Sequence, residues 1–137
     1  MKQHSTNYYN TLITVAEDCK TKEAIAPPVK EGKLTVANLQ YDMLMENSGD
    51  MTSDDLIFNV HAVRKDLIEQ ELEAERTNFY SKGQACLRTS PLAKTYGWAI
   101  YHDDKGKIKL LDPNTDEYRR LMEDDGIKKV PAMKSSK

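Results

Sequence analysis

The stretch TYGWAIYHDDKGKIKLLD, residues 95–112, decides the fold. Trp98, Ile100 and His102 occupy every second position in the first half, and Ile108 and Leu110 do so in the second. A period of two is typical of a strand with one buried face. Between the halves lies DDKG, where Gly106 can supply the positive φ that a tight turn needs. The stretch is therefore predicted to be a β-hairpin.

A further strand is predicted upstream at YNTLITVA, residues 9–16, where Leu12, Ile13 and Val15 stand among threonines. Residues 17–33 follow with many charges and with Pro27 and Pro28, neither of which suits a helix or strand interior. This second segment is predicted to be an exposed loop.

Helical patterns separate the first strand from the hairpin. Residues 35–46 place Val36, Leu39, Met43 and Leu44 on one apolar stripe. In MTSDDLIFNVHAVRKD, residues 51–66, Thr52 or Ser53 is predicted to cap a second helix, with two aspartates in its first turn. A third helix is predicted to start at a capping box between Asp66 and Glu69. Its expected core contacts are Ile68, Leu72 and Phe79.

A final helix is predicted in PNTDEYRRLMEDDG, residues 113–126, with Asn114 or Thr115 as its cap and Gly126 as its stop. The element order β, α, α, α, β, β, α indicates the α+β class. We expect a small antiparallel sheet of about three strands, the N-terminal strand plus the C-terminal hairpin, with about four helices over one face. Residues 1–126 are predicted to form a single globular domain, and residues 127–137 a basic, flexible tail.

Composition narrows the function classes. The chain has 137 residues and a formal charge of −2, from 20 basic and 22 acidic side chains, so no strong positive field favours nucleic acid. No apolar run reaches the roughly 18 residues of a membrane span, and the first residues lack a signal-peptide pattern. We therefore expect a cytoplasmic protein. Cys19 and Cys86 are expected to be reduced thiols, and no metal or cofactor is predicted.

An anion site is the leading interpretation of residues 82–98. Arg88 offers a planar fork for a carboxylate or phosphate, while lysines act as point charges. The expected ligand-binding residues are Lys82, Gln84, Arg88, Ser90, Lys94 and Trp98. No phosphate-loop or dinucleotide pattern accompanies them. In the alternative interpretation, Arg88 pairs with an acid of the third helix and the segment is a solvated loop.

A thiol site is the sharpest enzymatic hypothesis. Cys86 would be the nucleophile, and His61 or His102 the base that lowers the pKa of the thiol. The tripeptide Gln-Ala-Cys matches the start of a caspase signature, but Leu87 and Arg88 stand where that signature continues differently.

Four segments resemble a family of small uncharacterised bacterial proteins, a domain of unknown function: VANLQYDML, TSDDLIFNVHAVR, SKGQACLRTSPLAKTYGW and EYRRL. The resemblance implies a bacterial cytosolic protein and no assigned activity. Relatives often read Gly-Trp-Gly-Ile-His where this chain has Gly97, Trp98, Ala99, Ile100 and Tyr101. The missing histidine weakens a metal or acid–base role for this strand.

The sequence thus favours a domain that binds an anionic small molecule, or a protein partner, through residues 82–98 and the hairpin. A thiol-dependent enzyme and a structural or interaction subunit are the alternatives.

Overall fold

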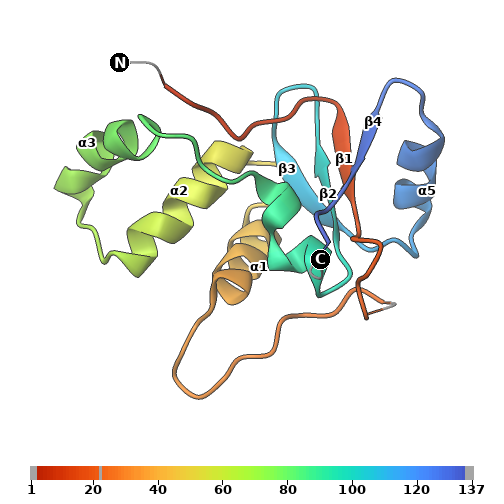
Figure 1. The fold of residues 1–137 in the computed structure, drawn as a ribbon, viewed down its shortest axis with the longest axis horizontal. Helices are drawn as coiled ribbons and strands as arrows, with labels where there is room; N and C mark the ends of the chain where they lie inside the picture. The colour runs from red at the N-terminus through yellow and green to blue at the C-terminus, as the bar shows by residue number, and fades with distance from the viewer. Residues whose placement is uncertain (1–2, 22, 135–137) are drawn as a thin grey trace.

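Strand β1 (Thr11–Thr14) lies inside a four-stranded sheet in a computed structural model that describes residues 3–21 and 23–134. The strand order is β3 (Ile108–Leu111), β2 (Ala99–His102), β1, β4 (Lys128–Pro131). β1 pairs antiparallel with β2 and parallel with β4 (Figure 1). The α+β class is confirmed, whereas the expected three-stranded antiparallel sheet is a mixed sheet of four strands.

The β-hairpin predicted from the sequence is present. Ile100 lies opposite Leu110 in the antiparallel pair, and Gly106 adopts a φ of 80° in the turn. The Asp103 carboxylate accepts hydrogen bonds from the backbone amides of Lys105 and Lys107, which holds the turn closed.

Helices cover both faces of the sheet, where the sequence predicts cover on one. Ile13, Ile100 and Ile108 share a core with α1 (Val36–Glu46), α2 (Ser53–Arg64) and α4 (Pro91–Lys94). Leu12, Ala99 and Leu111 pack on the other face, against Tyr118 and Leu121 of α5 (Asp116–Glu123). Two covered faces explain why Leu12 and Ile13 are both fully buried.

Three helices begin where threonines cap them. The side chains of Thr35, Thr52 and Thr115 each accept a hydrogen bond from a backbone amide in the first turn. The third helix is different: α3 (Glu69–Phe79) begins after Ile68, whose amide donates to the Glu71 carboxylate at 3.0 Å. Asp66 takes a left-handed φ of 53° instead of capping the helix.

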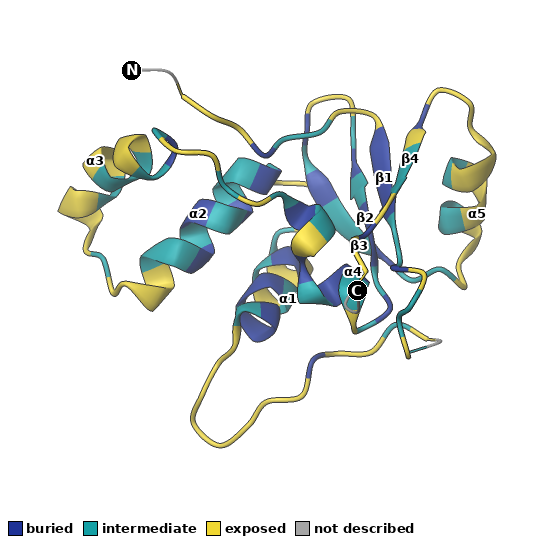
Figure 2. Ribbon diagram, in the orientation of Figure 1, coloured by how far each residue is buried: buried dark blue, intermediate teal, exposed yellow. Residues whose placement is uncertain are grey.

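The predicted core contacts of α3 are wrong in part. Ile68 is 59% exposed, and no residue of α3 is buried, as Figure 2 shows. Phe79 and Leu72 are half-buried. α3 packs on α2 through an ion pair between Arg76 and Asp55 at 2.9 Å and through edge-to-face stacking of Phe79 on Phe58. α3 therefore lies at the outer side of the fold and is joined to the core through α2 (Figure 1).

The segment predicted to be a flexible tail forms part of the sheet. Backbone amides of Lys128 and Ala132 donate to carbonyls of Asn10 and Thr14, at 2.8 and 2.9 Å, so this segment pairs along the whole of β1. Ala132 is buried in the core. A strand at the edge of a sheet needs few apolar residues. The basic sequence of β4 therefore gives no sign of a strand. Residues 135–137 lie outside the described residues.

The long loop before α1 is anchored at Gly97 and Trp98. The amide of Ile25 donates to the Tyr96 carbonyl at 3.0 Å, and Trp98 Nε1 donates to the Ile25 carbonyl at 2.8 Å. Gly97 has a φ of +79°, and a Cβ there would meet the Glu23 carbonyl oxygen at 2.7 Å. The loop backbone thus passes where only glycine leaves room.

Gly97→Ala should destabilise the protein more than Gly49→Ala. Both glycines have left-handed φ values, 79° and 77°, but nothing lies within 4 Å of a Cβ at Gly49. Gly49→Ala should cost about 1 kcal/mol of unfolding free energy for the backbone conformation, and Gly97→Ala about 2 kcal/mol more for the clash with the loop. Urea denaturation measures both. Equal losses would mean that the loop moves aside freely.

His102 is a buried polar residue at the end of β2. Its ring is fully buried, its Nδ1 lies 3.3 Å from the Ile100 carbonyl, and its Nε2 has no hydrogen-bond partner within the described residues. The Tyr8 ring packs edge-on against it. Burial lowers the pKa of His102 from 6.5 to about 4, so the imidazole is neutral at pH 7.

Stability should therefore fall as the pH drops from 6.5 towards 4. The unfolded chain takes up a proton at His102 in this range and the folded chain does not, which costs up to about 3 kcal/mol. Urea titrations at pH 7 and pH 4.5 on wild type and His102→Leu measure the difference. The leucine variant should lose less stability, while the exposed-site control His4→Gln should behave as wild type. Identical pH dependence in wild type and His102→Leu would contradict the buried neutral imidazole.

Candidate functional site

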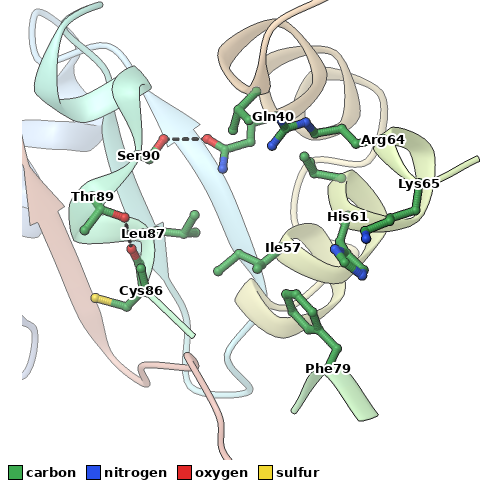
Figure 3. Close-up of a pocket in the computed structure, with 13 residues that line it drawn as sticks. Gln40, Ile57, His61, Arg64, Lys65, Phe79, Cys86, Leu87, Thr89 and Ser90 are labelled. Atoms are coloured by element: carbon green, nitrogen blue, oxygen red, sulfur yellow. Dashed lines mark hydrogen bonds between the residues drawn. The ribbon is translucent and has the colours of Figure 1, made fainter. Parts of the chain in front are cut away.

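A cavity of about 430 Å³ lies between α1, α2 and residues 85–90, the segment that contains the 3₁₀ turn Leu87–Thr89 (Figure 3). Ile57 of α2 and Leu87 of the opposite wall point towards each other across it. Its apolar lining consists of Val36, Ile57, Val60, Phe79, Ala85 and Leu87. A volume of this size is in the range of small-molecule sites.

Among the described residues, the ionisable groups that line the cavity include three basic side chains and no carboxylate. His61, Arg64 and Lys65 all lie in the last turn of α2 or just beyond it. His61 Nε2 lies 2.8 Å from the Glu75 carboxylate, and this bond is the main cause that lowers the pKa of Glu75, with a smaller contribution from the charge of Lys65. Arg64 has no ion pair or hydrogen bond among the described residues.

Two polar side chains form the opposite wall. Ser90 Oγ accepts from the Leu92 amide as the cap of α4 and donates to Gln40 Oε1 at 2.6 Å. Ser90 and Gln40 are both buried, at 3% and 5% exposure. Since the amide oxygen of Gln40 is engaged by Ser90, its Nε2 faces the cavity (Figure 3).

Cys86 also lines the cavity, but its sulfur points away from it. Sγ lies 3.2 Å from the Tyr8 hydroxyl, on the side away from His61 (Figure 3). Burial, together with the hydrogen bond to Cys86, raises the pKa of Tyr8 to about 12, so the phenol stays protonated. The geometry gives no support to a base that acts on the thiol: His61 is bonded to Glu75, and His102 is buried against the other side of Tyr8.

The six residues predicted to bind an anion do not converge. Ser90 alone among them lines the cavity. Three others use their side-chain nitrogens on backbone carbonyls: Arg88 Nε on Pro131, Gln84 Nε2 on Phe79 and Trp98 Nε1 on Ile25, each at 2.8 Å. Lys82 is exposed and Lys94 half-buried. The predicted pairing of Arg88 with an acid of α3 does not occur, because its guanidinium is directed at the end of β4.

Residues 3–137 match the family of unknown function DUF6157. The chain belongs to this family. No curated protein and no solved structure gives a significant match to it. The family assignment therefore indicates no activity, and the cavity is the feature of this DUF6157 member that bears on its chemistry.

Sequence reasoning missed Gln40, Arg64 and Lys65. One signal was available for Gln40: it stands four residues after Val36 and four before Leu44, in the middle of an apolar line along α1. An amide at such a position has to find a partner or face a cavity. Arg64 and Lys65 carry no such signal, because cations in the last turn of a helix are common.

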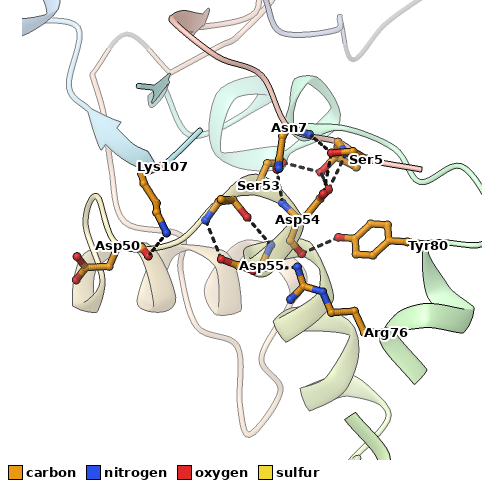
Figure 4. Close-up of polar contacts among 11 residues, drawn as sticks. Ser5, Asn7, Asp50, Ser53, Asp54, Asp55, Arg76, Tyr80 and Lys107 are labelled. Atoms are coloured by element: carbon orange, nitrogen blue, oxygen red, sulfur yellow. Dashed lines mark hydrogen bonds and ion pairs between the residues drawn. The ribbon is translucent and has the colours of Figure 1, made fainter. Parts of the chain in front are cut away.

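The N-terminal end of α2 is a second polar cluster in this DUF6157 protein (Figure 4). The Asp54 carboxylate accepts from Ser5 Oγ at 2.7 Å and from the Thr6 amide at 2.6 Å, while the Asp54 amide donates to Asn7 Oδ1. Tyr80 Oη donates to the Asp54 carbonyl at 2.6 Å. These bonds tie the N-terminal segment and the end of α3 to α2, so Asp54 has a structural role.

No helix within residues 3–21 and 23–134 has the length and apolarity that crossing a bilayer demands. Over the same described ranges, no three His, Cys, Asp or Glu side chains are grouped so that they could hold a metal ion.

Arg88→Ala should weaken the sheet edge without altering the cavity. The variant leaves the Pro131 carbonyl without its side-chain donor, which should cost about 1 kcal/mol of unfolding free energy. The control Arg119→Ala removes an exposed ion pair with Asp116 and should change stability by less than about 0.5 kcal/mol. Chemical denaturation measures both. Unchanged stability together with lost anion binding in Arg88→Ala would restore the anion-site role predicted for Arg88.

Proposed function

We propose that the protein binds a small organic anion with an apolar body in the cavity between α1, α2 and residues 85–90. One observation carries the proposal: apolar side chains form about half of the lining, and among the described residues its ionisable groups include three basic side chains and no carboxylate. An apolar enclosure with a few convergent polar groups is the usual construction of a ligand site.

The source of the positive charge is Arg64. Glu75 is bonded to His61 at 2.8 Å and acts only weakly on the charge of Lys65, which extends beyond the end of α2. No partner among the described residues offsets Arg64. An anion in the cavity would supply that partner, in surroundings where apolar walls strengthen the attraction.

Binding is better supported than thiol chemistry. A nucleophile must present its reacting atom to the substrate, and the Cys86 sulfur is turned to Tyr8 instead. The proposal keeps the anionic ligand predicted from the sequence and moves its site from Arg88 and the hairpin to the cavity.

A thermal-shift screen against aliphatic and aromatic acids, nucleotides and sugar phosphates tests the proposal. A ligand at 100 times its Kd should stabilise the wild type by about 2.7 kcal/mol, a shift of several degrees. Arg64→Ala should abolish most of that shift, because it removes the charge at the cavity.

Arg120→Ala is the matched control, since Arg120 occupies the last turn of α5 as Arg64 does that of α2, away from the cavity. Each variant loses the same interaction with a helix terminus. If the thermal shift survives in Arg64→Ala, the proposal is rejected. If no tested anion shifts the wild type, the proposal is also rejected and the protein-partner alternative is favoured.

A further inference from the structure

We infer that the occupant is a monocarboxylate whose carboxylate lies between Gln40 and Arg64 and whose apolar body packs against Ile57, Phe79 and Leu87. The inference rests on the proposed function and names the ligand class for the same cavity.

Gln40 is held in one orientation by Ser90. The Ser90 hydroxyl accepts from the Leu92 amide, so its proton is given to Gln40 Oε1. The Gln40 amide is therefore held with its NH₂ group towards the cavity, and no group among the described residues accepts from Nε2. Gln40 is 95% buried, at 5% exposure. Nε2 is not among the buried polar atoms without a partner in the described residues, so it is open to the cavity, where a ligand oxygen can accept its hydrogen bond.

Arg64 lies in the last turn of α2 and lines the cavity. Its side chain extends from the end of α2 across the cavity towards Gln40 (Figure 3). A guanidinium binds a carboxylate through two parallel hydrogen bonds in one plane. If one oxygen of the ligand carboxylate accepts a hydrogen bond from Gln40 Nε2, the remaining lone pairs of that carboxylate face the Arg64 guanidinium.

The charges at the cavity bear on the head group of the ligand. Arg64 brings one positive charge and has no acidic partner among the described residues, while Glu75 is bonded to His61 and acts only weakly on Lys65. A carboxylate brings one negative charge, whereas a phosphate monoester brings about −1.5 to −2 at pH 7. A carboxylate therefore supplies the one partner that Arg64 lacks among the described residues, whereas a phosphate monoester brings more negative charge than Arg64 alone compensates.

Apolar side chains border the remaining space of the cavity. Ile57 and Leu87 face each other across the cavity, and Phe79 closes one side, with its ring stacked on His61 at 4.4 Å between centroids. These surfaces offer no hydrogen bonds to a sugar or a peptide backbone. An alkyl or aryl chain would gain affinity by removing this apolar surface from water.

Isothermal titration calorimetry with octanoate, octanamide and octyl phosphate tests the inference. The three probes share one chain and differ in the head group. Octanoate should bind at least tenfold more tightly than octanamide, which has no charge for Arg64, and more tightly than octyl phosphate.

Variants at Gln40 test the contact directly. Gln40→Glu places a carboxylate against that of the ligand and should abolish octanoate binding, while Ser90 can still donate to it and keep the wall in place. Gln40→Met removes the donor without adding charge and should weaken octanoate about tenfold, which keeps the test valid if the glutamate variant unfolds. Gln70→Glu, with the same charge change on the exposed face of α3, should bind as wild type.

A direct readout is the side-chain amide signal of Gln40 in a ¹⁵N-correlated NMR spectrum, assigned by its loss in Gln40→Met. It should shift on addition of octanoate. If octyl phosphate binds more tightly than octanoate, or Gln40→Met binds octanoate as wild type does, the carboxylate inference is overturned while the proposed function stands. If none of the three probes nor any anion of the thermal-shift screen binds at millimolar concentration, both fail.

Discussion

The rest of the structure depends on the burial of β1 on both faces. Leu12 and Ile13 are adjacent, point to opposite sides of the sheet and are both fully buried. Such a strand needs a paired neighbour on each edge and a helical layer on each face. β2 and β4 supply the neighbours, α1, α2 and α4 one layer, and α5 the other.

The same constraint explains the chain path after the hairpin. β3 runs antiparallel to β2, and β2 antiparallel to β1, so β3 has the direction of β1 and of its parallel neighbour β4. A connection between two parallel edge strands has to cross one face of the sheet, and α5 makes this crossing on the face of Leu12. The parallel pairing of β4 and the helix on the second face of the sheet thus have the same cause.

Local signals in the sequence were sufficient for the hairpin and for most helix starts. Alternation and Gly106 marked the hairpin, and Thr52 marked the start of α2, because these features act within a few residues of the structure they specify. β4 could not be found in this way. Its sequence, KKVP, is basic and ends in proline, which an edge strand tolerates and which resembles a tail. Only its pairing with the distant β1 makes it a strand.

The candidate site shows a similar limit for side chains. Residues 82–98 hold many donors, but Arg88, Gln84 and Trp98 spend theirs on the carbonyls of Pro131, Phe79 and Ile25, all of which lie in loops or at the ends of elements. Carbonyls there lack regular ladder partners, so nearby donors are drawn to them. A loop-rich segment with many side-chain donors therefore indicates backbone carbonyls that need hydrogen-bond partners as much as it indicates a ligand site.

The cavity differs from that segment because its donors are left over after the fold is satisfied. The negative end of the α2 dipole accounts for a basic residue at position 64, as it does for Arg120 on α5. It does not account for the extension of Arg64 towards Gln40, nor for an amide that Ser90 orients so that its nitrogen faces open space. Since α1, the loop before α4 and the end of α2 each contribute to this arrangement, no single element's stability requires it. A ligand oxygen would satisfy both donors at once, and this is the physical basis for assigning the cavity to a carboxylate.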